Sequence, residues 1–287
     1  MACFPSFGAW RVKQNLPTFA MNKKQKDMDK NKTAVIQLVR NATLKIHYAG
    51  KCILVDPVLA EKETLRSALG VNKNPRVHLN MSAADLVKDV DMVLLTHNHI
   101  DHYEPSVRHY LPYTIPFFTQ PADKEPIVHD GFMNVEAIEE MKQLGEVSIF
   151  RTNGHHGFGK LAEMMGPVSG FVLESKGLPT IYVMGDCRWE NTIRENIDRY
   201  HPDYIVVNCG GAVFPEFSKD FGPILPDEHE VMQILDEVPK NVRLIAVHMD
   251  AIDHCQTTRE ILRNEAQHNH IDMNRLIIPE DGECIAL

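Results

Sequence analysis

The feature that most constrains the fold is Thr96–His102, a segment that packs three histidines and one aspartate behind a short apolar run. The apolar run, Asp91–Thr96, predicts a buried strand. A strand that ends in a tight loop can point alternate side chains at one centre. Burying four such polar groups together would be costly unless they bind a metal. The segment therefore predicts a metal site at a strand end, with imidazole and carboxylate donors that suit zinc, manganese or iron.

Short β-type runs come first along the chain, and strands alternate with helices later. Strands are predicted at Val35–Val39, Thr43–Tyr48, Cys52–Val55, Asp91–Thr96, Glu146–Phe150, Phe171–Glu174, Thr180–Met184, Tyr204–Asn208, Arg243–His248 and Leu276–Ile278. Helices are predicted at Ala83–Asp89, Trp189–Tyr200, Asp227–Glu237 and Thr257–His268. Ser82 is the expected N-cap of the first helix, and D-x-x-E and T-x-x-E capping boxes open the last two. This order predicts an α/β fold in which sheet packs on sheet with helices outside.

The pattern covers residues 33–287, which are predicted to form one domain, whereas residues 1–32 are predicted to be an N-terminal extension. In the extension, the basic run Lys23–Lys26 follows aromatic residues, which is the wrong order for a secretory signal. The 6 cysteines are scattered and form no CxxC pair, which fits a reducing compartment. We therefore expect a cytoplasmic protein.

Charge and hydropathy limit the kinds of partner. The net charge is -9 and the body of the chain has no long Lys/Arg stripe, whereas a nucleic-acid groove needs a basic surface. No apolar run approaches the length that spans a bilayer. We expect a small-molecule substrate, no nucleic acid and no membrane, and the sequence leaves a homo-oligomer open.

The segment His97–His102 matches H-x-H-x-D-H, the signature of the metallo-β-lactamase superfamily, which the chain resembles. The resemblance implies an αββα sandwich, a hydrolase activity and two divalent metal ions, zinc or manganese. The remaining motifs of the superfamily can be found downstream, each at the end of a predicted strand, as His155-His156, Asp186 and His248. The resemblance assigns the first metal to His97, His99 and His156, the second to Asp101, His102 and His248, and the bridge between them to Asp186.

Two adjacent histidines compete for one ligand position. A G-H pair favours His155, but the H-G form of the motif favours His156, so we assign His156 as the ligand and His155 to substrate contact. His254 is a second candidate for substrate contact. Asp186 is also compatible with a helix N-cap, and His248 with a buried core histidine.

Four other positions have both a functional and a structural interpretation. Asp56 either orients a ligating histidine or is a turn residue. Asn208–Gly211 either brings backbone amides to a ligand or forms a simple turn. Cys187 is expected to be a small buried hydrophobic residue, and His268 and His270 are expected at a solvated helix end.

Within the superfamily, three stretches are similar to the L-ascorbate-6-phosphate lactonase-like branch. They are Ile53–Pro57, Met165–Leu173 and Tyr182–Asp186. The resemblance implies that a metal-bridged hydroxide attacks a small anionic ester or lactone, with Asp101 as the catalytic residue that orients the nucleophile and carries a proton. The alternatives are a phosphodiesterase of the same fold and a non-catalytic metal-binding protein.

Overall fold

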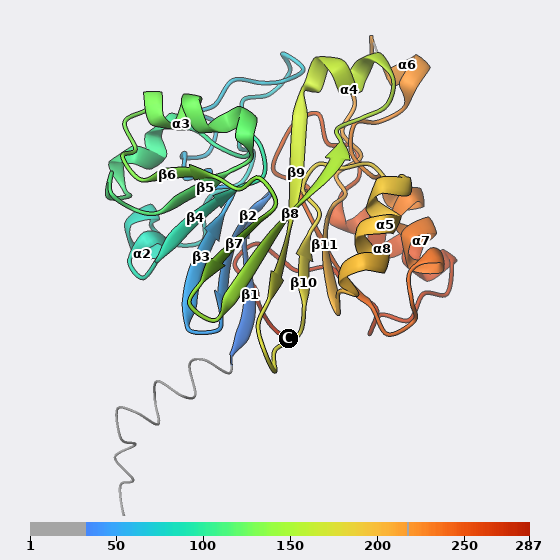
Figure 1. Ribbon diagram of the computed structural model, residues 1–287. Coiled ribbons are helices and arrows are strands. Elements are labelled where there is room, and N and C mark those ends of the chain that lie inside the picture. The colour runs from blue at the N-terminus through green and yellow to red at the C-terminus, as the bar shows by residue number, and fades with distance from the viewer. Residues whose placement is uncertain (1–32, 217) are drawn as a thin grey trace, which may run out of the picture.

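The computed structural model describes residues 33–287 apart from residue 217, and its strands form two stacked sheets (Figure 1). Each sheet has seven strands, in the orders β14-β1-β2-β3-β4-β5-β6 and β13-β12-β11-β10-β9-β8-β7. The predicted extension, residues 1–32, lies outside the described residues. In the part that is described, no helix is long and apolar enough to cross a membrane.

The strands of the first sheet and the helices near it come from the N-terminal half, except for the last strand. They are β1 Ala34–Arg40, β2 Thr43–Tyr48, β3 Lys51–Val55, α2 Ala83–Val87, β4 Met92–Leu95, η1 Pro105–His109, β5 Phe117–Thr119, η2 Pro121–Asp123, α3 Lys124–His129, β6 Val135–Ala137 and β14 Cys284–Ala286. The second sheet and its helices comprise β7 Met141–Leu144, β8 Val147–His155, α4 Lys160–Met165, β9 Pro167–Glu174, β10 Ile181–Val183, α5 Asn191–Tyr200, β11 Tyr204–Asn208, α6 Ser218–Phe221, α7 Glu228–Glu237, β12 Arg243–Val247, α8 Arg259–His268 and β13 Leu276–Ile277.

Apolar side chains from both sheets form the central core. Ile46, Val55, Phe171 and Ile245 are among its fully buried members. A second core lies between the C-terminal sheet and α5, α7 and α8, and a third lies between the N-terminal sheet and α2. Figure 1 shows the same order of layers, with helices on the outer face of each sheet. The predicted αββα sandwich is confirmed.

Local turn and cap chemistry agrees with the sequence at several element ends. The β2–β3 hairpin turns at Ala49 and Gly50, which have φ of 48° and 76°, a geometry typical of tight two-residue hairpins. Ser82 Oγ accepts the Asp85 N–H at the start of α2, and Asp227 accepts the Glu230 N–H at the start of α7. These predicted N-caps are confirmed.

The predicted capping box at Thr257 is wrong. Thr258 caps α8 instead, and its hydroxyl accepts the Ile261 N–H at 3.2 Å. Thr257 is engaged elsewhere, because its N–H donates to the Gly210 carbonyl and its hydroxyl donates to Glu228.

Candidate metal centre and substrate pocket

Four of the candidate ligands lie on the loop that follows β4. His97, Asp101 and His102 are buried there, and His99 is partly buried. The strand ends against β3 and β5 in the parallel part of its sheet, so the loop leaves the carboxyl edge of that sheet.

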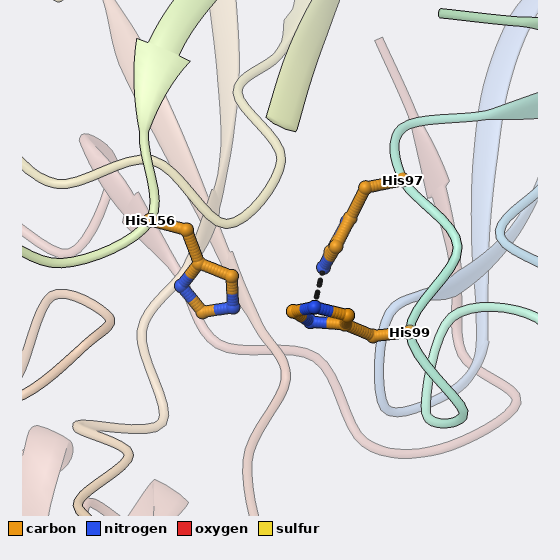
Figure 2. A group of neighbouring side chains, drawn as sticks. All are labelled: His97, His99 and His156. Atoms are coloured by element: carbon orange, nitrogen blue, oxygen red, sulfur yellow. Dashed lines mark hydrogen bonds between the residues drawn. The ribbon is translucent and has the colours of Figure 1, made fainter. Parts of the chain in front are cut away.

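The second sheet supplies the other three candidate ligands. His156 follows β8, Asp186 follows β10 and His248 follows β12, and all three are buried. Figure 2 shows the ring of His156 facing His97 and His99 across the gap between the two loops. The structure therefore brings together all seven predicted ligands, from both sheets.

Asp186 Oδ2 lies among four imidazoles. It is 3.1 Å from His102 Nε2, 3.3 Å from His156 Nε2, and 3.8 Å from Nε2 of both His97 and His248. A carboxylate oxygen that faces histidines from both halves of the cluster is where a bridging ligand would lie.

The remaining donors fall into two groups. In one, His97 Nε2 lies 3.0 Å from His99 Nδ1, with His156 beside them. In the other, His102 Nε2 lies 3.1 Å from His248 Nε2, which is 3.4 Å from Asp101 Oδ2. These groups have the same members as the two predicted ligand sets.

The ring nitrogens that face away from the cluster also have partners. His99 Nε2 donates to the Met165 carbonyl at 3.0 Å, and His156 Nδ1 donates to the Ile224 carbonyl at 3.0 Å. A ring held by a hydrogen bond at one nitrogen presents the other as a lone-pair donor, because a neutral imidazole carries a single N–H.

Asp56 orients two of the candidate ligands. Its carboxylate accepts the Thr96 N–H at 2.8 Å, the Thr96 hydroxyl at 2.7 Å and His102 Nδ1–H at 2.8 Å. The Thr96 hydroxyl has one proton, which it donates to Asp56. The Thr96 hydroxyl oxygen therefore accepts a hydrogen bond from His97 Nδ1–H, at 3.1 Å. The structure supports the interpretation of Asp56 as an orienting group.

The pKa values in the cluster reflect burial and close charges. Burial opposes ionisation of Asp186, yet His102 and His248 hold its pKa well below its ordinary value. Burial lowers the pKa of His156 to about 4, although Asp186 opposes the shift. Burial also acts against protonation of His102, but Asp186 and Asp56 outweigh it and raise its pKa to about 10. A metal binding here must displace that proton.

The donor set fits a divalent transition metal. Once the bound protons are displaced, it combines neutral imidazoles with ionised carboxylates, the mixture that zinc and manganese accept. Each of three subsets offers ligand atoms that lie within 4.8 Å of one another: His97, His99 and His156; His97, His102 and Asp186; and Asp101, His102 and His248.

A cavity of about 430 Å³ adjoins the cluster. His99, Asp101 and His156 line its inner end. His254, which was predicted to contact substrate, lies on its wall. Most of its other lining side chains are apolar: Ala68, Ile100, Met165, Phe214, Ile224 and Ile252.

His155 lies away from this cavity. His155 is the last residue of β8, whereas His156 lies in the bend that follows and faces His97 and His99. The His155 side chain is 61% exposed, and its Nδ1 donates to Glu190 at 2.8 Å. It lines a separate cavity of about 770 Å³ that contains none of the seven candidate ligands. The structure thus places His155 apart from the candidate ligands and from the cavity beside them.

Three supporting residues escaped the sequence-based prediction of the site. Asn41 Nδ2 donates to the Asp101 carbonyl at 3.2 Å, and the His248 N–H donates to the Asn41 carbonyl at 3.0 Å. Asn208 Nδ2 donates to Asp186 Oδ1 at 2.6 Å, and the thiol of Cys255 lies 3.5 Å from His248 Nδ1. The only sequence signal among them was the position of Asn208 at a strand end.

Several structural interpretations are also settled. The N-cap of α5 is Glu190, so Asp186 does not cap that helix. Gly210 packs tightly on the His248 carbonyl, because an added Cβ would lie 2.3 Å from that oxygen. The glycine at position 210 therefore serves to let the backbone pack closely against His248. Cys187 is fully buried in the second core, as predicted, and His268 and His270 are exposed.

Known proteins resemble this chain over most of its length. Residues 51–249 match the family described as beta-lactamase superfamily domain. The UPF0173 protein YddR of Bacillus subtilis is 34% identical, over 86% of this chain and 98% of that protein.

Two solved structures are similar in both fold and sequence. A possible metal-dependent hydrolase from Veillonella parvula superimposes with a TM-score of 0.84 at 31% identity, covering 89% of this chain and 99% of the other. An isothiocyanate hydrolase from Delia radicum gut bacteria superimposes with a TM-score of 0.82 at 32% identity, covering 88% of this chain and 99% of the other. By its fold, its sequence and these relatives, the chain belongs to the metallo-β-lactamase superfamily, within the UPF0173 family of metal-dependent hydrolases.

Proposed function

We propose that this hydrolase acts on a small, largely apolar electrophile, such as an isothiocyanate or an uncharged ester or lactone. The observation that carries the proposal is the cavity beside the cluster. Its volume is about 430 Å³, which lies in the range of small-molecule sites, and most of the surface of its wall is apolar. Such a wall favours a substrate that brings an apolar substituent to the reacting centre.

The isothiocyanate hydrolase supports the same substrate class. It is 32% identical to this chain and is covered almost completely by the alignment. An isothiocyanate combines a small apolar substituent with a strongly electrophilic carbon, so it matches both the wall of the cavity and the hydrolytic cluster.

We further propose that the cluster holds two divalent ions, zinc or manganese, because each donor group is complete. When bound, such ions lower the pKa of water and polarise an electrophile. Asp101 lines the cavity, and its carboxylate is ionised because the hydrogen bond from His248 outweighs the opposing effect of burial on its pKa. Asp101 is thus placed to accept a hydrogen bond from the attacking water and to hold its proton.

The hydrolysis of an isothiocyanate balances with water alone. The water oxygen forms a bond to the central carbon, and the π electron pair of the C=N bond moves to nitrogen, which takes up a proton. The resulting thiocarbamic acid separates into an amine and carbonyl sulfide when the C–N bond breaks and nitrogen takes up the remaining acidic proton.

A phosphorylated sugar lactone fits the cavity less well. Among the described lining residues, Arg66 is the one lysine or arginine, and a sugar phosphate would place many polar groups against apolar side chains. A lactone without these groups keeps the same reaction and avoids that cost.

The proposal is tested by turnover of four probes after reconstitution with zinc or manganese. The probes are benzyl isothiocyanate, phenyl acetate, δ-valerolactone and bis(p-nitrophenyl) phosphate. We expect hydrolysis of at least one of the first three, and its loss in His102→Ala, which removes a buried member of the cluster. Hydrolysis of the phosphodiester alone would contradict the proposal and favour the phosphodiesterase.

A further inference from the structure

The cavity wall contains a buried histidine whose side chain is not fully used by the protein. His254 is 7% exposed and lines the cavity with Asp101, His99 and His156. Its Nδ1 is buried and has no hydrogen-bond partner among the described residues. Buried polar groups are normally paired, so a ring on the cavity wall with an unpaired nitrogen has hydrogen-bonding capacity that the protein does not use.

The protein holds His254 in place through its neighbours. Its carbonyl accepts the Val213 N–H at 3.0 Å, and its ring stacks on Phe214 with centroids 5.4 Å apart and planes at 19°. The preceding residue, Asp253, accepts hydrogen bonds from Ser67 Oγ at 2.5 Å and Asn74 Nδ2 at 2.9 Å. These bonds fasten residues 66–74, here called the strap, next to the cavity.

Burial favours the uncharged form of the His254 ring. Burial lowers its pKa below the ordinary value, against the opposing charge of Asp101. A neutral imidazole has one N–H donor and one acceptor nitrogen. It can therefore donate to a substrate atom that becomes negative without adding a net charge to an apolar cavity.

We propose that His254 donates a hydrogen bond to the substrate heteroatom that receives the electron pair when water adds to the electrophilic carbon. This inference rests on the proposed function and assigns a specific role to one residue of the cavity. In an isothiocyanate the heteroatom is the nitrogen of the N=C=S group, and in an ester or lactone it is the carbonyl oxygen. Donors aimed at developing charge stabilise the transition state more than the ground state.

The test compares His254→Phe with variants that restore an N–H. Phenylalanine keeps a flat ring for stacking on Phe214 but cannot donate. Asparagine carries an amide near the Nδ1 position and glutamine one near the Nε2 position. The matched control is His155→Phe, the same change at a histidine outside the cavity.

Two readouts are needed, and one of them requires no turnover. We expect His254→Phe to lower kcat by about 10- to 100-fold on the probes that wild type hydrolyses, with unchanged metal content and melting temperature. Binding of N-benzylurea, a stable analogue of the addition product, should weaken by about tenfold in calorimetry. Either His254→Asn or His254→Gln should recover part of both losses, and His155→Phe should match wild type.

The outcomes separate this inference from the proposed function. If wild type hydrolyses none of the probes but binds N-benzylurea through His254, the function fails and the inference stands. The inference is overturned if His254→Phe retains wild-type turnover and binding, if it loses metal, or if neither amide variant recovers any loss. Absence of both turnover and N-benzylurea binding in wild type would overturn both.

Discussion

The substitution Asp56→Asn tests whether the orientation of the cluster depends on a residue that is not itself a candidate ligand. Asp56 is 1% exposed, and its two carboxylate oxygens accept three hydrogen bonds from Thr96 and His102. Asparagine has the same shape, but its amide nitrogen would replace the oxygen that accepts from the Thr96 hydroxyl and His102 Nδ1. An NH₂ group there would favour the wrong tautomer of His102 and, through Thr96, of His97.

The size of the effect follows from the bonds that are lost. Each hydrogen bond to a charged acceptor stabilises a protein by about 1.5–3 kcal/mol, so two lost bonds set an upper range of about 3–6 kcal/mol. Removal of a buried negative charge offsets part of this loss, and we expect the metal-free variant to lose about 2–4 kcal/mol of unfolding free energy. Changes in groups that orient metal ligands weaken metal binding by about 10- to 100-fold, and we expect the upper end because two histidines are affected.

The assay combines urea unfolding of the metal-free protein with zinc titration in competition with a fluorescent chelator. Asp236→Asn is the matched control, because the Asp236 side chain is 89% exposed and lies 3.8 Å from Lys240 in a surface pair. The control should match wild type in both measurements. Zinc affinity equal to that of wild type in Asp56→Asn would refute the orienting role.

Further predictions concern the metals, the ligands and the strap. Elemental analysis should find two divalent ions per chain, because both donor groups are complete; a protein that retains no metal after reconstitution would contradict the two-metal proposal. His156→Ala should lose metal, whereas His155→Ala should keep both metal and turnover, since His155 lies outside the cavity. Asp186→Asn should weaken binding of the second metal and reduce turnover, and two retained ions with wild-type turnover would exclude a bridging role. Asp253→Asn should increase hydrogen exchange in residues 66–74. Burial opposes ionisation of Asp253, but the bonds from the strap lower its pKa, so this tethering is present above the unfolded pKa and is lost as the pH falls through the acid range.

Much of the cluster could be predicted because its members are marked locally in the sequence. The ligands His97 to His102 are consecutive in one motif, and His156, Asp186 and His248 each follow an apolar run that forms a strand. Residues that follow strand ends at one edge of a sheet lie close together, so the position of each ligand after a strand was enough to predict that the ligands meet.

The parts that were missed depend on contacts between distant segments. Asn41 follows β1, and only the packing of the two sheets brings it to His248. Cys255 reaches His248 because the loop after β12 folds back on itself, which a lone cysteine in the sequence does not indicate. Which histidine faces the cluster depends on where β8 ends, and two adjacent histidines do not reveal that the strand continues to His155.

Short strands at the borders of the sheets were also missed. β6 and β7 each form one edge of a sheet, with β14 and β13 at the opposite edges, and neither β6 nor β7 has a fully buried residue. They lack a strong apolar pattern because only one neighbouring strand and part of one face constrain them.

The division of the seven candidate ligands between the two sheets has a consequence for folding. Four donors come from the loop after β4 and three from the ends of β8, β10 and β12. A metal that uses both sets acts as a cross-link between the two halves of the sandwich, and a ligand present at 1,000 times its dissociation constant adds about 4 kcal/mol to stability. Removal of metal by a chelator should therefore weaken the packing of one half on the other. Hydrolytic activity requires not only that each half is folded but also that the two halves are packed together.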